Sequence, residues 1–240
     1  MTAMLPTERT VPNSELSNKI ILLYGKPKVG KSTLASKFPG AVFAATEPGL
    51  KYLSVHQTPI ADWLGFAKMC HALMETEHDF KTLVVDTIDL LWDMLCDYIA
   101  KKHGHSHISD FTGWGKGYSM AKQEMTRVLT KVANMPTKKG HGMGLVLVSH
   151  ANEVEDDGKL VWMPSLSKAP RLVLTAMSDI ICFADIYQNS EGGIGRTLRL
   201  APHPKFVTGG RIHNLPDVIG LEYTELAQAI QSAIKGDSNE

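Results

Sequence analysis

The residues best suited to chemistry form a loop rich in glycine and lysine between an apolar run and an amphipathic segment. Residues 25–32 read G-x-x-x-x-G-K-S and directly follow the apolar run 19–24. Glycines let the backbone approach an anion closely, so that successive N–H groups and the positive end of the following helix converge on a phosphate. The pattern predicts a nucleoside triphosphate site, formed by Gly25, Lys26, Pro27, Lys28, Val29, Gly30, Lys31, Ser32 and Thr33.

Two side chains of this loop and one distant aspartate have predicted roles with a nucleoside triphosphate and Mg²⁺. Lys31 is expected to lie along the β- and γ-phosphates, and the Ser32 hydroxyl to complete the shell of a Mg²⁺ ion. The apolar run 83–85 closes on Asp86 in the Walker B pattern, in which the carboxylate holds the Mg²⁺ water shell opposite Ser32. A nucleoside triphosphate and Mg²⁺ are therefore the expected substrate and cofactor.

Two more polar residues lie where apolar runs end. Glu47 follows the run 41–46, and His150 ends the run 145–150. Open parallel sheets place their chemistry just beyond the carboxyl ends of the strands. These positions resemble those of RecA-like proteins, in which a glutamate activates the attacking water and a polar residue senses the γ-phosphate. The resemblance implies these roles for Glu47 and His150, whose neutral imidazole can donate from one nitrogen. The alternatives are a solvated loop glutamate and a capping histidine without a ligand.

The order of apolar runs and amphipathic segments predicts an α/β fold with a mostly parallel central sheet flanked by helices. Buried strands are expected at 19–24, 41–46, 83–86, 145–150 and 180–185, with helices at 31–38, 60–73, 88–102, 120–135, 169–178 and 223–235. A hairpin over 153–163 turning at Asp157-Gly158 and an alternating edge strand over 196–200 complete the C-terminal half. We divide the chain into a flexible arm (1–18), one domain (19–235) and a tail (236–240).

Composition limits the classes of partner. The 25 basic and 25 acidic residues cancel, so nucleic acid could be bound only by local patches. Cys70, Cys96 and Cys182 have no metal-binding spacing and are expected to be reduced, buried thiols. No apolar run is long enough to span a bilayer, and no signal-peptide pattern is present, which predicts a cytoplasmic protein without a membrane partner.

Four segments resemble a family of phage-encoded, RecA-like P-loop ATPases that are described as AAA-type nucleotide-binding proteins: G-K-P-K-V-G-K-S-T-L-A, T-E-P-G-L, L-V-V-D-T-I and L-V-S-H. The resemblance covers roughly residues 19–220. Asp86 is followed by Thr87 rather than by the glutamate of the oligomeric AAA+ branch, and this difference favours Glu47 as the base. Some members of the family are single-strand annealing recombinases. The resemblance implies ATP hydrolysis in DNA recombination, in the host cytoplasm if the chain is phage-encoded.

The same resemblance implies partners and the residues that contact them. Expected partners are single-stranded DNA, further copies of the chain in a ring or filament, and a single-strand binding protein. Two loops, 103–117 and 151–170, are expected to face the DNA through aromatic and cationic side chains. Cations beyond the last strands are expected to reach the nucleotide of a neighbouring subunit. The DNA set is Phe111, Trp114, Lys116, Trp162, Lys168 and Arg171, and the trans-acting set is Lys205 and Arg211.

Several alternatives stay open from the sequence. The loop aromatics could instead be buried, and the H-x-H-x-H pattern of His103, His105 and His107 could bind a metal. A small-molecule or nucleotide kinase uses the same phosphate loop, although such kinases usually carry an arginine-rich lid that is absent here. A nucleotide-dependent regulator or assembly protein with weak hydrolysis would fit the balanced charge.

Overall fold

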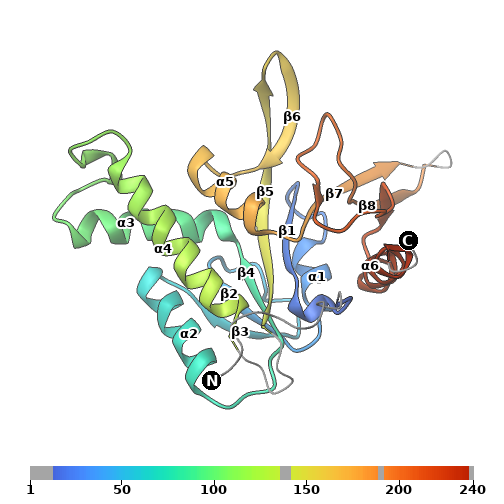
Figure 1. Ribbon diagram of the computed structural model, residues 1–240, viewed down its shortest axis with the longest axis horizontal. Helices are drawn as coiled ribbons and strands as arrows, with labels where there is room; N and C mark the ends of the chain where they lie inside the picture. The colour runs from blue at the N-terminus through green and yellow to red at the C-terminus, as the bar shows by residue number, and fades with distance from the viewer. Residues whose placement is uncertain (1–12, 136–141, 189–191, 238–240) are drawn as a thin grey trace, which may run out of the picture.

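A central β-sheet with helices on both faces organises the chain in the computed structural model (Figure 1), which describes residues 13–135, 142–188 and 192–237. The strands are β1 (Ile20–Gly25), β2 (Ala41–Ala45), β3 (His56–Pro59), β4 (Thr82–Asp86), β5 (Gly144–Asp156), β6 (Lys159–Pro164), β7 (Ile180–Gln188), β8 (Ile194–Arg199), β9 (Gly209–Gly210) and β10 (Val218–Gly220). The helices are η1 (Leu16–Asn18), α1 (Lys31–Ala35), α2 (Trp63–Glu75), α3 (Ile88–Lys102), η2 (Ile108–Asp110), α4 (Lys116–Ala133), α5 (Lys168–Met177) and α6 (Tyr223–Asp237).

The middle of the sheet is parallel and its C-terminal edge is antiparallel. The strand order is β10-β8-β7-β1-β5-β4-β2-β3, with β1 parallel to both β5 and β7. Strands β8 and β10 run antiparallel to their neighbours. The central strands are buried on both faces, which is why they read as continuous apolar runs. The predicted α/β fold of a P-loop NTPase, with a mostly parallel sheet and antiparallel edge strands, is therefore confirmed.

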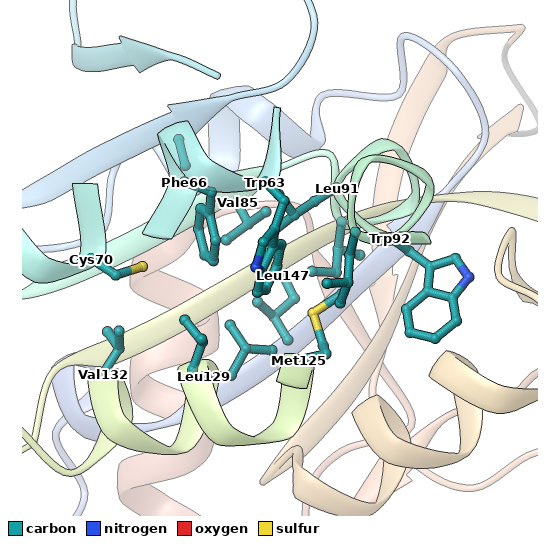
Figure 2. Packing of buried hydrophobic residues seen from close by; sticks show 14 of the residues in the cluster. Trp63, Phe66, Cys70, Val85, Leu91, Trp92, Met125, Leu129, Val132 and Leu147 are labelled. Atoms are coloured by element: carbon teal, nitrogen blue, oxygen red, sulfur yellow. The ribbon is translucent and has the colours of Figure 1, made fainter. Parts of the chain in front are cut away.

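Two apolar layers hold the helices on the sheet. Helices α2, α3, α4 and α5 cover one face and α1 and α6 cover the other (Figure 1). Figure 2 shows the first layer, in which Trp63 and Phe66 of α2 meet Leu91 of α3 and Met125 of α4 against the sheet residue Val85. These five side chains are fully or almost fully buried. The parallel strands are thereby held rigidly, so that the loops at their carboxyl ends are positioned by a packed core.

Several local expectations are corrected by the structure. Helix α1 ends at Ala35 instead of reaching Phe38. Pro39 disfavours helical backbone at the residue before it, so a helix is expected to end before Phe38. Strand β8 is not the edge, since β10 pairs with it. Strand β3 was not predicted, because its four residues are all exposed and carry no apolar alternation. Helix α4 begins at Lys116 rather than Met120, which shortens the preceding loop.

The predicted N-terminal arm and C-terminal tail are only partly among the residues that the structure describes. Residues 1–12 of the predicted arm and 238–240 of the predicted tail lie outside the described residues. Residues 16–18 form η1, and Leu16 is buried against the sheet. Among the helices of the described ranges, none is long and apolar enough to cross a membrane.

Candidate nucleotide site

The register of the strands brings the residues predicted to act on the nucleotide to the carboxyl ends of the central parallel strands. Gly25 of β1 lies opposite His150 of β5, and Asp86 of β4 lies opposite Val148 on the other side of β5. Ala45 of β2 lies opposite Asp86, so Glu47 follows two residues beyond that position. Residues far apart in the sequence therefore meet because the parallel pairing of four strands ends at the same level.

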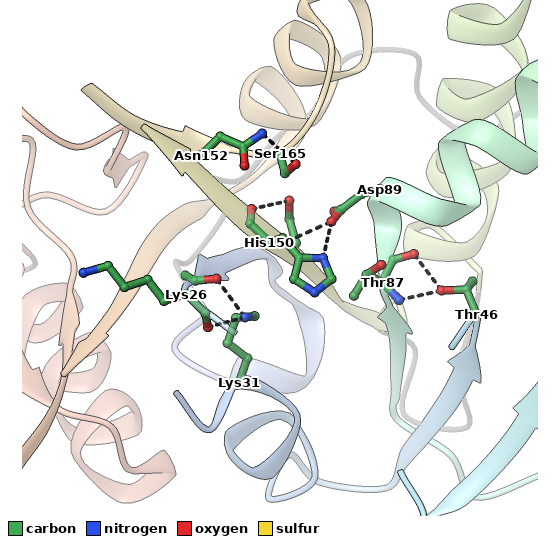
Figure 3. Close-up of polar contacts among 10 residues, drawn as sticks. Lys26, Lys31, Thr46, Thr87, Asp89, His150, Asn152 and Ser165 are labelled. Carbon is green, nitrogen blue, oxygen red and sulfur yellow. Dashed lines mark hydrogen bonds and ion pairs between the residues drawn. The ribbon is translucent and has the colours of Figure 1, made fainter. Parts of the chain in front are cut away.

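The loop after β1 has the geometry of a phosphate cradle. Gly30 has a φ of 111°, a left-handed conformation that favours glycine, directly before the first residue of α1. At Gly25 a Cβ would lie 2.4 Å from the Ala184 carbonyl oxygen, so a side chain cannot be placed there. The Lys31 ammonium donates to the carbonyl oxygens of Gly25 (2.8 Å) and Lys26 (2.9 Å), as Figure 3 shows. Burial lowers the pKa of Lys31, while the nearby carboxylate of Asp86 acts in the opposite direction.

Ser32 and Asp86 form the pair that fits a divalent cation. The Ser32 hydroxyl donates to Asp86 Oδ2 across 2.6 Å, and Asp86 is only 4% exposed. Burial raises the pKa of this carboxyl group, whereas the Ser32 hydrogen bond lowers it. A hydroxyl and a carboxylate oxygen are hard ligands of the kind that Mg²⁺ prefers. The residues present therefore fit the predicted metal.

A cavity of about 520 Å³ lies over the loop. Its size is in the range of pockets that hold small-molecule ligands. Most predicted site residues meet in it, and Tyr52 and Leu53 add an aromatic and an aliphatic wall that the sequence did not reveal. The lining comprises Pro27, Lys28, Gly30, Lys31, Ser32, Thr33, Glu47, Pro48, Gly49, Tyr52, Leu53, Asp86, Thr87 and His150.

Replacing the buried carboxylate of Asp86 should stabilise the nucleotide-free protein. Because the folded-state pKa of Asp86 is raised above its unfolded value, the folded state binds more protons and loses stability as pH rises through the folded pKa. Asp86→Asn removes this cost and should raise the thermal midpoint at pH 7–8 by about 2–4 °C, corresponding to about 1 kcal/mol. The gain should shrink toward acid pH, where the carboxyl group is protonated in both states. Calorimetry checks this, with Asp217→Asn as an exposed control; a lower midpoint at pH 8 would contradict it.

His150 is held by an aspartate that sequence reasoning missed. Asp89 Oδ2 accepts the backbone N–H of His150 (2.9 Å) and hydrogen-bonds to its ring Nδ1 (2.8 Å), as Figure 3 shows. Asp89 lies in the first turn of α3, three residues after the strand-ending Asp86. The signal in the sequence was the second aspartate of D-T-I-D, which carries no meaning until β4 and β5 are placed side by side.

A second contact that the sequence did not reveal fixes the turn leading to Glu47. Thr46 Oγ1 donates to the Thr87 carbonyl oxygen (3.0 Å) and accepts the Thr87 N–H (2.6 Å). The Thr46 N–H also donates to the carbonyl oxygen of Asp86 (2.9 Å). These bonds fasten the end of β2 to the end of β4, so that Glu47 emerges beside the metal-binding pair. Glu47 itself is half-buried in the cavity wall.

Trp162, a predicted DNA residue, contacts the phosphate loop. Lys26 Nζ lies 4.8 Å from the centre of the Trp162 ring and 3.7 Å from Asp185 Oδ1. Trp162 also packs against Phe183, and its carbonyl oxygen accepts the Tyr24 hydroxyl (3.0 Å). The base of the β5–β6 hairpin is thus joined to the loop that would hold the triphosphate.

The remaining residues that were predicted to contact DNA differ in their exposure to solvent and in their contacts within the protein. Trp114 is fully exposed just before Lys116, which is also exposed, while Phe111 is half-buried and packs against the rings of His103 and His105. In the second loop, Lys168 is exposed at the start of α5. Arg171 is fastened internally, because its guanidinium donates to Met163 Sδ and to the Leu166 carbonyl oxygen.

The two predicted DNA loops meet at an acidic cleft. The cleft has a volume of about 290 Å³, and His107 and Ile108 of the first loop and residues 165–167 of the second line it together with α3. Helix α3 contributes three aspartates, Asp89, Asp93 and Asp97. Partial burial and the other two carboxylates raise the pKa of Asp93. A phosphate backbone would be repelled from the floor of this cleft, so any DNA contact of these loops belongs to their outer surface.

The two predicted trans-acting cations lie in different places. Lys205 is exposed in a segment beside the base of the hairpin, where its carbonyl oxygen accepts the Trp162 N–H. Arg211 donates to Asp179 Oδ1 (3.2 Å) and to the Ala176 carbonyl oxygen (2.7 Å). Asp179 immediately precedes β7, so Arg211 lies at the amino ends of the parallel strands. The nucleotide cavity lies at their carboxyl ends.

No metal-binding cluster of three or more histidine, cysteine or acidic residues occurs in the described part of the chain. Two of the three histidines of the H-x-H-x-H pattern pack against Phe111, and the ring centres of His105 and Phe111 are 4.3 Å apart. His107 instead caps η2 by accepting the Ser109 N–H. The three cysteines are free and buried, as expected.

The comparisons with known proteins agree with this geometry at the level of the family. A family model described as an AAA domain matches residues 17–212, which is more than half of the chain. No curated protein matches the chain. The matched region contains the phosphate loop, the Ser32–Asp86 pair, Glu47 and His150. The chain therefore belongs to the AAA domain family of nucleotide-binding P-loop ATPases.

Proposed function

We propose that the chain hydrolyses ATP by a Glu47-assisted attack of water on the γ-phosphate, and that this activity serves RecA-like DNA recombination. The observation that supports hydrolysis most directly is the convergence of Lys31, Ser32, Glu47, Asp86 and His150 on one cavity. Phosphoryl transfer needs little more from a protein than positioning and charge stabilisation, and these residues provide both.

Each residue has a defined task in this proposal. The ammonium of Lys31 turns from the carbonyl oxygens that it now contacts to the β- and γ-phosphates. Ser32 and Asp86 would hold Mg²⁺, which neutralises charge on the phosphate oxygens. The Glu47 carboxylate accepts a proton as the water oxygen bonds to the γ-phosphorus and the bond to the β,γ-bridging oxygen breaks. ADP is the leaving group.

The kinase alternative has weaker support. A kinase must keep water away from the γ-phosphate and present an acceptor hydroxyl in its place. Here the cavity wall next to the metal-binding pair carries a half-buried carboxylate, which suits water activation. Measuring inorganic phosphate and ADP in equal amounts from ATP, with no phosphorylated acceptor among added nucleosides and nucleotides, would support the ATPase. Transfer to an acceptor would overturn it.

For single-stranded DNA, the outer surface of the loop between α3 and α4 offers the strongest support. Trp114 exposes its whole ring beside the exposed Lys116, and an aromatic face with a nearby cation suits a base and its phosphate. Lys168 at the start of α5 belongs to the second predicted loop, which meets the first at the acidic cleft. We propose that DNA crosses the rim of this cleft and not its floor.

Trp114→Ala should weaken binding of a single-stranded oligonucleotide. Loss of one base-stacking platform costs about 1–3 kcal/mol, which is roughly a 5- to 150-fold higher Kd. Fluorescence anisotropy at a fixed salt concentration measures it, with Tyr187→Ala as a control at another exposed aromatic ring. Lys116→Ala should also reduce the salt dependence of binding, because one phosphate contact is lost. Equal Kd values for all variants would remove these residues from the proposal.

DNA-stimulated hydrolysis and self-association complete the functional proposal. ATP turnover measured with and without single-stranded DNA should rise with DNA, and light scattering should detect rings or filaments. Lys205 is exposed near the hairpin that contacts the phosphate loop, and we propose that it contacts the nucleotide of a neighbouring subunit. Arg211 is a weaker candidate, since Asp179 already binds it. A single-strand binding protein remains a proposed partner.

A further inference from the structure

The pairing of Asp89 with His150 determines which face of the imidazole meets the nucleotide. Asp89 Oδ2 lies within hydrogen-bond distance of both the backbone nitrogen and ring Nδ1 of His150. The side chain of Asp89 is 13% exposed and that of His150 is 36% exposed, so the pair lies at the cavity wall, partly shielded from solvent. A carboxylate can only accept hydrogen bonds. Nδ1 must therefore carry the hydrogen of this bond.

The other ring nitrogen then has a defined character. A neutral imidazole carries one hydrogen, so a ring protonated at Nδ1 has a lone pair at Nε2. In Figure 3 this second nitrogen points away from Asp89 and toward the side of Lys31. His150 also lines the cavity together with Glu47. A neutral His150 therefore presents an acceptor to the cavity, whereas the predicted sensing of a phosphate oxygen needs a donor.

The attacking water can donate a hydrogen bond to Nε2 of His150 in the nucleotide cavity. An attacking water has two hydrogens and must turn a lone pair toward phosphorus. Glu47 can accept one hydrogen and Nε2 of His150 the other, which leaves the lone pair free. A γ-phosphate oxygen has no hydrogen to donate to Nε2, so a direct contact would place two hydrogen-bond acceptors side by side, which is repulsive.

We propose that Asp89 is a positioning residue, which holds His150 in its Nδ1-protonated tautomer so that Nε2 orients the attacking water. This inference rests on the proposed ATPase function and deepens it. Asp89 also lines the acidic cleft between α3, η2 and residues 165–167, so a structural change in that cleft can alter the position of the water-orienting nitrogen through a single side chain. No proton leaves the Asp89–His150 bond in this role.

The tautomer can be measured without relying on activity. Two-bond ¹H–¹⁵N correlation spectra of the ¹⁵N-histidine-labelled full chain distinguish the two neutral tautomers at pH 8, and His150→Gln identifies the signals of His150 among the ten histidines. We expect the Nδ1-protonated pattern in the wild type and its loss in Asp89→Leu, which is similar in size but has no acceptor. An Nε2-protonated ring in the wild type overturns the proposal.

Steady-state hydrolysis of Mg²⁺–ATP tests the consequence. Asp89→Leu should lower kcat by roughly 10- to 100-fold, as loss of an orienting partner commonly does, with a much smaller change in KM. Asp89→Asn should recover part of the loss because its amide oxygen can still accept from Nδ1. Asp93→Asn is the matched control, since Asp93 lies one turn further along α3 and lines the same cleft without an observed bond to His150.

The outcomes separate this inference from the proposed function. Full kcat in Asp89→Leu overturns the positioning role even if hydrolysis itself is intact. A large rise in KM at unchanged kcat also overturns it, because that result would mean that Asp89 supports binding. If the wild-type chain does not hydrolyse ATP, the proposed function fails and the water-orienting role with it, while the spectra still decide the tautomer.

Discussion

Lys31→Ala is expected to remove ATP binding almost completely while leaving the fold intact. Lys31 is 7% exposed in the structure, and its ammonium donates to two carbonyl oxygens of the phosphate loop. It can exchange these neutral partners for phosphate oxygens at little cost in rearrangement. Losing one partner of such a desolvated charge pair costs about 2–5 kcal/mol or more, which is at least roughly a 30-fold higher Kd for ATP. Isothermal titration calorimetry measures it.

The fold should survive the change because burial already disfavours the charged form of Lys31. The pKa of this lysine is lowered by burial, so its charge contributes little to the stability of the nucleotide-free protein. Lys37→Ala is the control, since Lys37 is exposed and follows α1 outside the cavity. Wild-type ATP affinity in Lys31→Ala, with a normal thermal midpoint, would contradict the nucleotide site.

Glu47→Gln should abolish most turnover but preserve binding. The substitution keeps the shape of the side chain and removes its ability to accept a proton, so the loss should appear in kcat and not in KM. General-base catalysis typically contributes 10²–10⁴-fold, and we expect kcat to fall by about that factor. Quenched-flow or steady-state measurement of phosphate release, together with ATP binding by calorimetry, separates the two effects.

The competing interpretation of Glu47 as a solvated loop residue makes the opposite prediction. In that case Glu47→Gln would behave like Glu75→Gln, a control at an exposed carboxylate near the end of α2. The structure favours a catalytic role because Glu47 is half-buried in the cavity wall and follows a turn fastened by the Thr46–Thr87 hydrogen bonds. Equal kcat for the two variants would overturn it.

Local sequence determined the phosphate loop and most of the elements around it. The G-x-x-x-x-G-K-S pattern is sufficient because its function depends on backbone conformation within eight neighbouring residues, and Gly30 has the left-handed φ that the pattern requires. The buried strands could also be predicted from the sequence, since a strand covered on both faces must be apolar along its whole length. The β5–β6 hairpin turned at Asp157-Gly158, where both residues have positive φ.

Patterns of exposed or short segments were less informative. Strand β3 has no apolar alternation, and β8 alternates like an edge strand although β10 covers it with only three residues. Trp162 looked like a free aromatic residue in a loop, but the structure places it beneath Lys26. Arg211 looked like a free cation and is bound to Asp179. The partners of Trp162 and Arg211 lie 136 and 32 positions away in the sequence.

The sequence by itself predicted a nucleotide site and the loop that forms it, because the residues of that pattern are neighbours in the chain. Only the tertiary structure decided how the other catalytic groups are oriented. The hydrogen bond that His150 donates to Asp89 joins residues 61 positions apart and exists because β4 and β5 are adjacent in the sheet. Strand order is a property of the packed core, and no short motif encodes it. The direction in which His150 presents its acceptor nitrogen therefore followed from the fold alone.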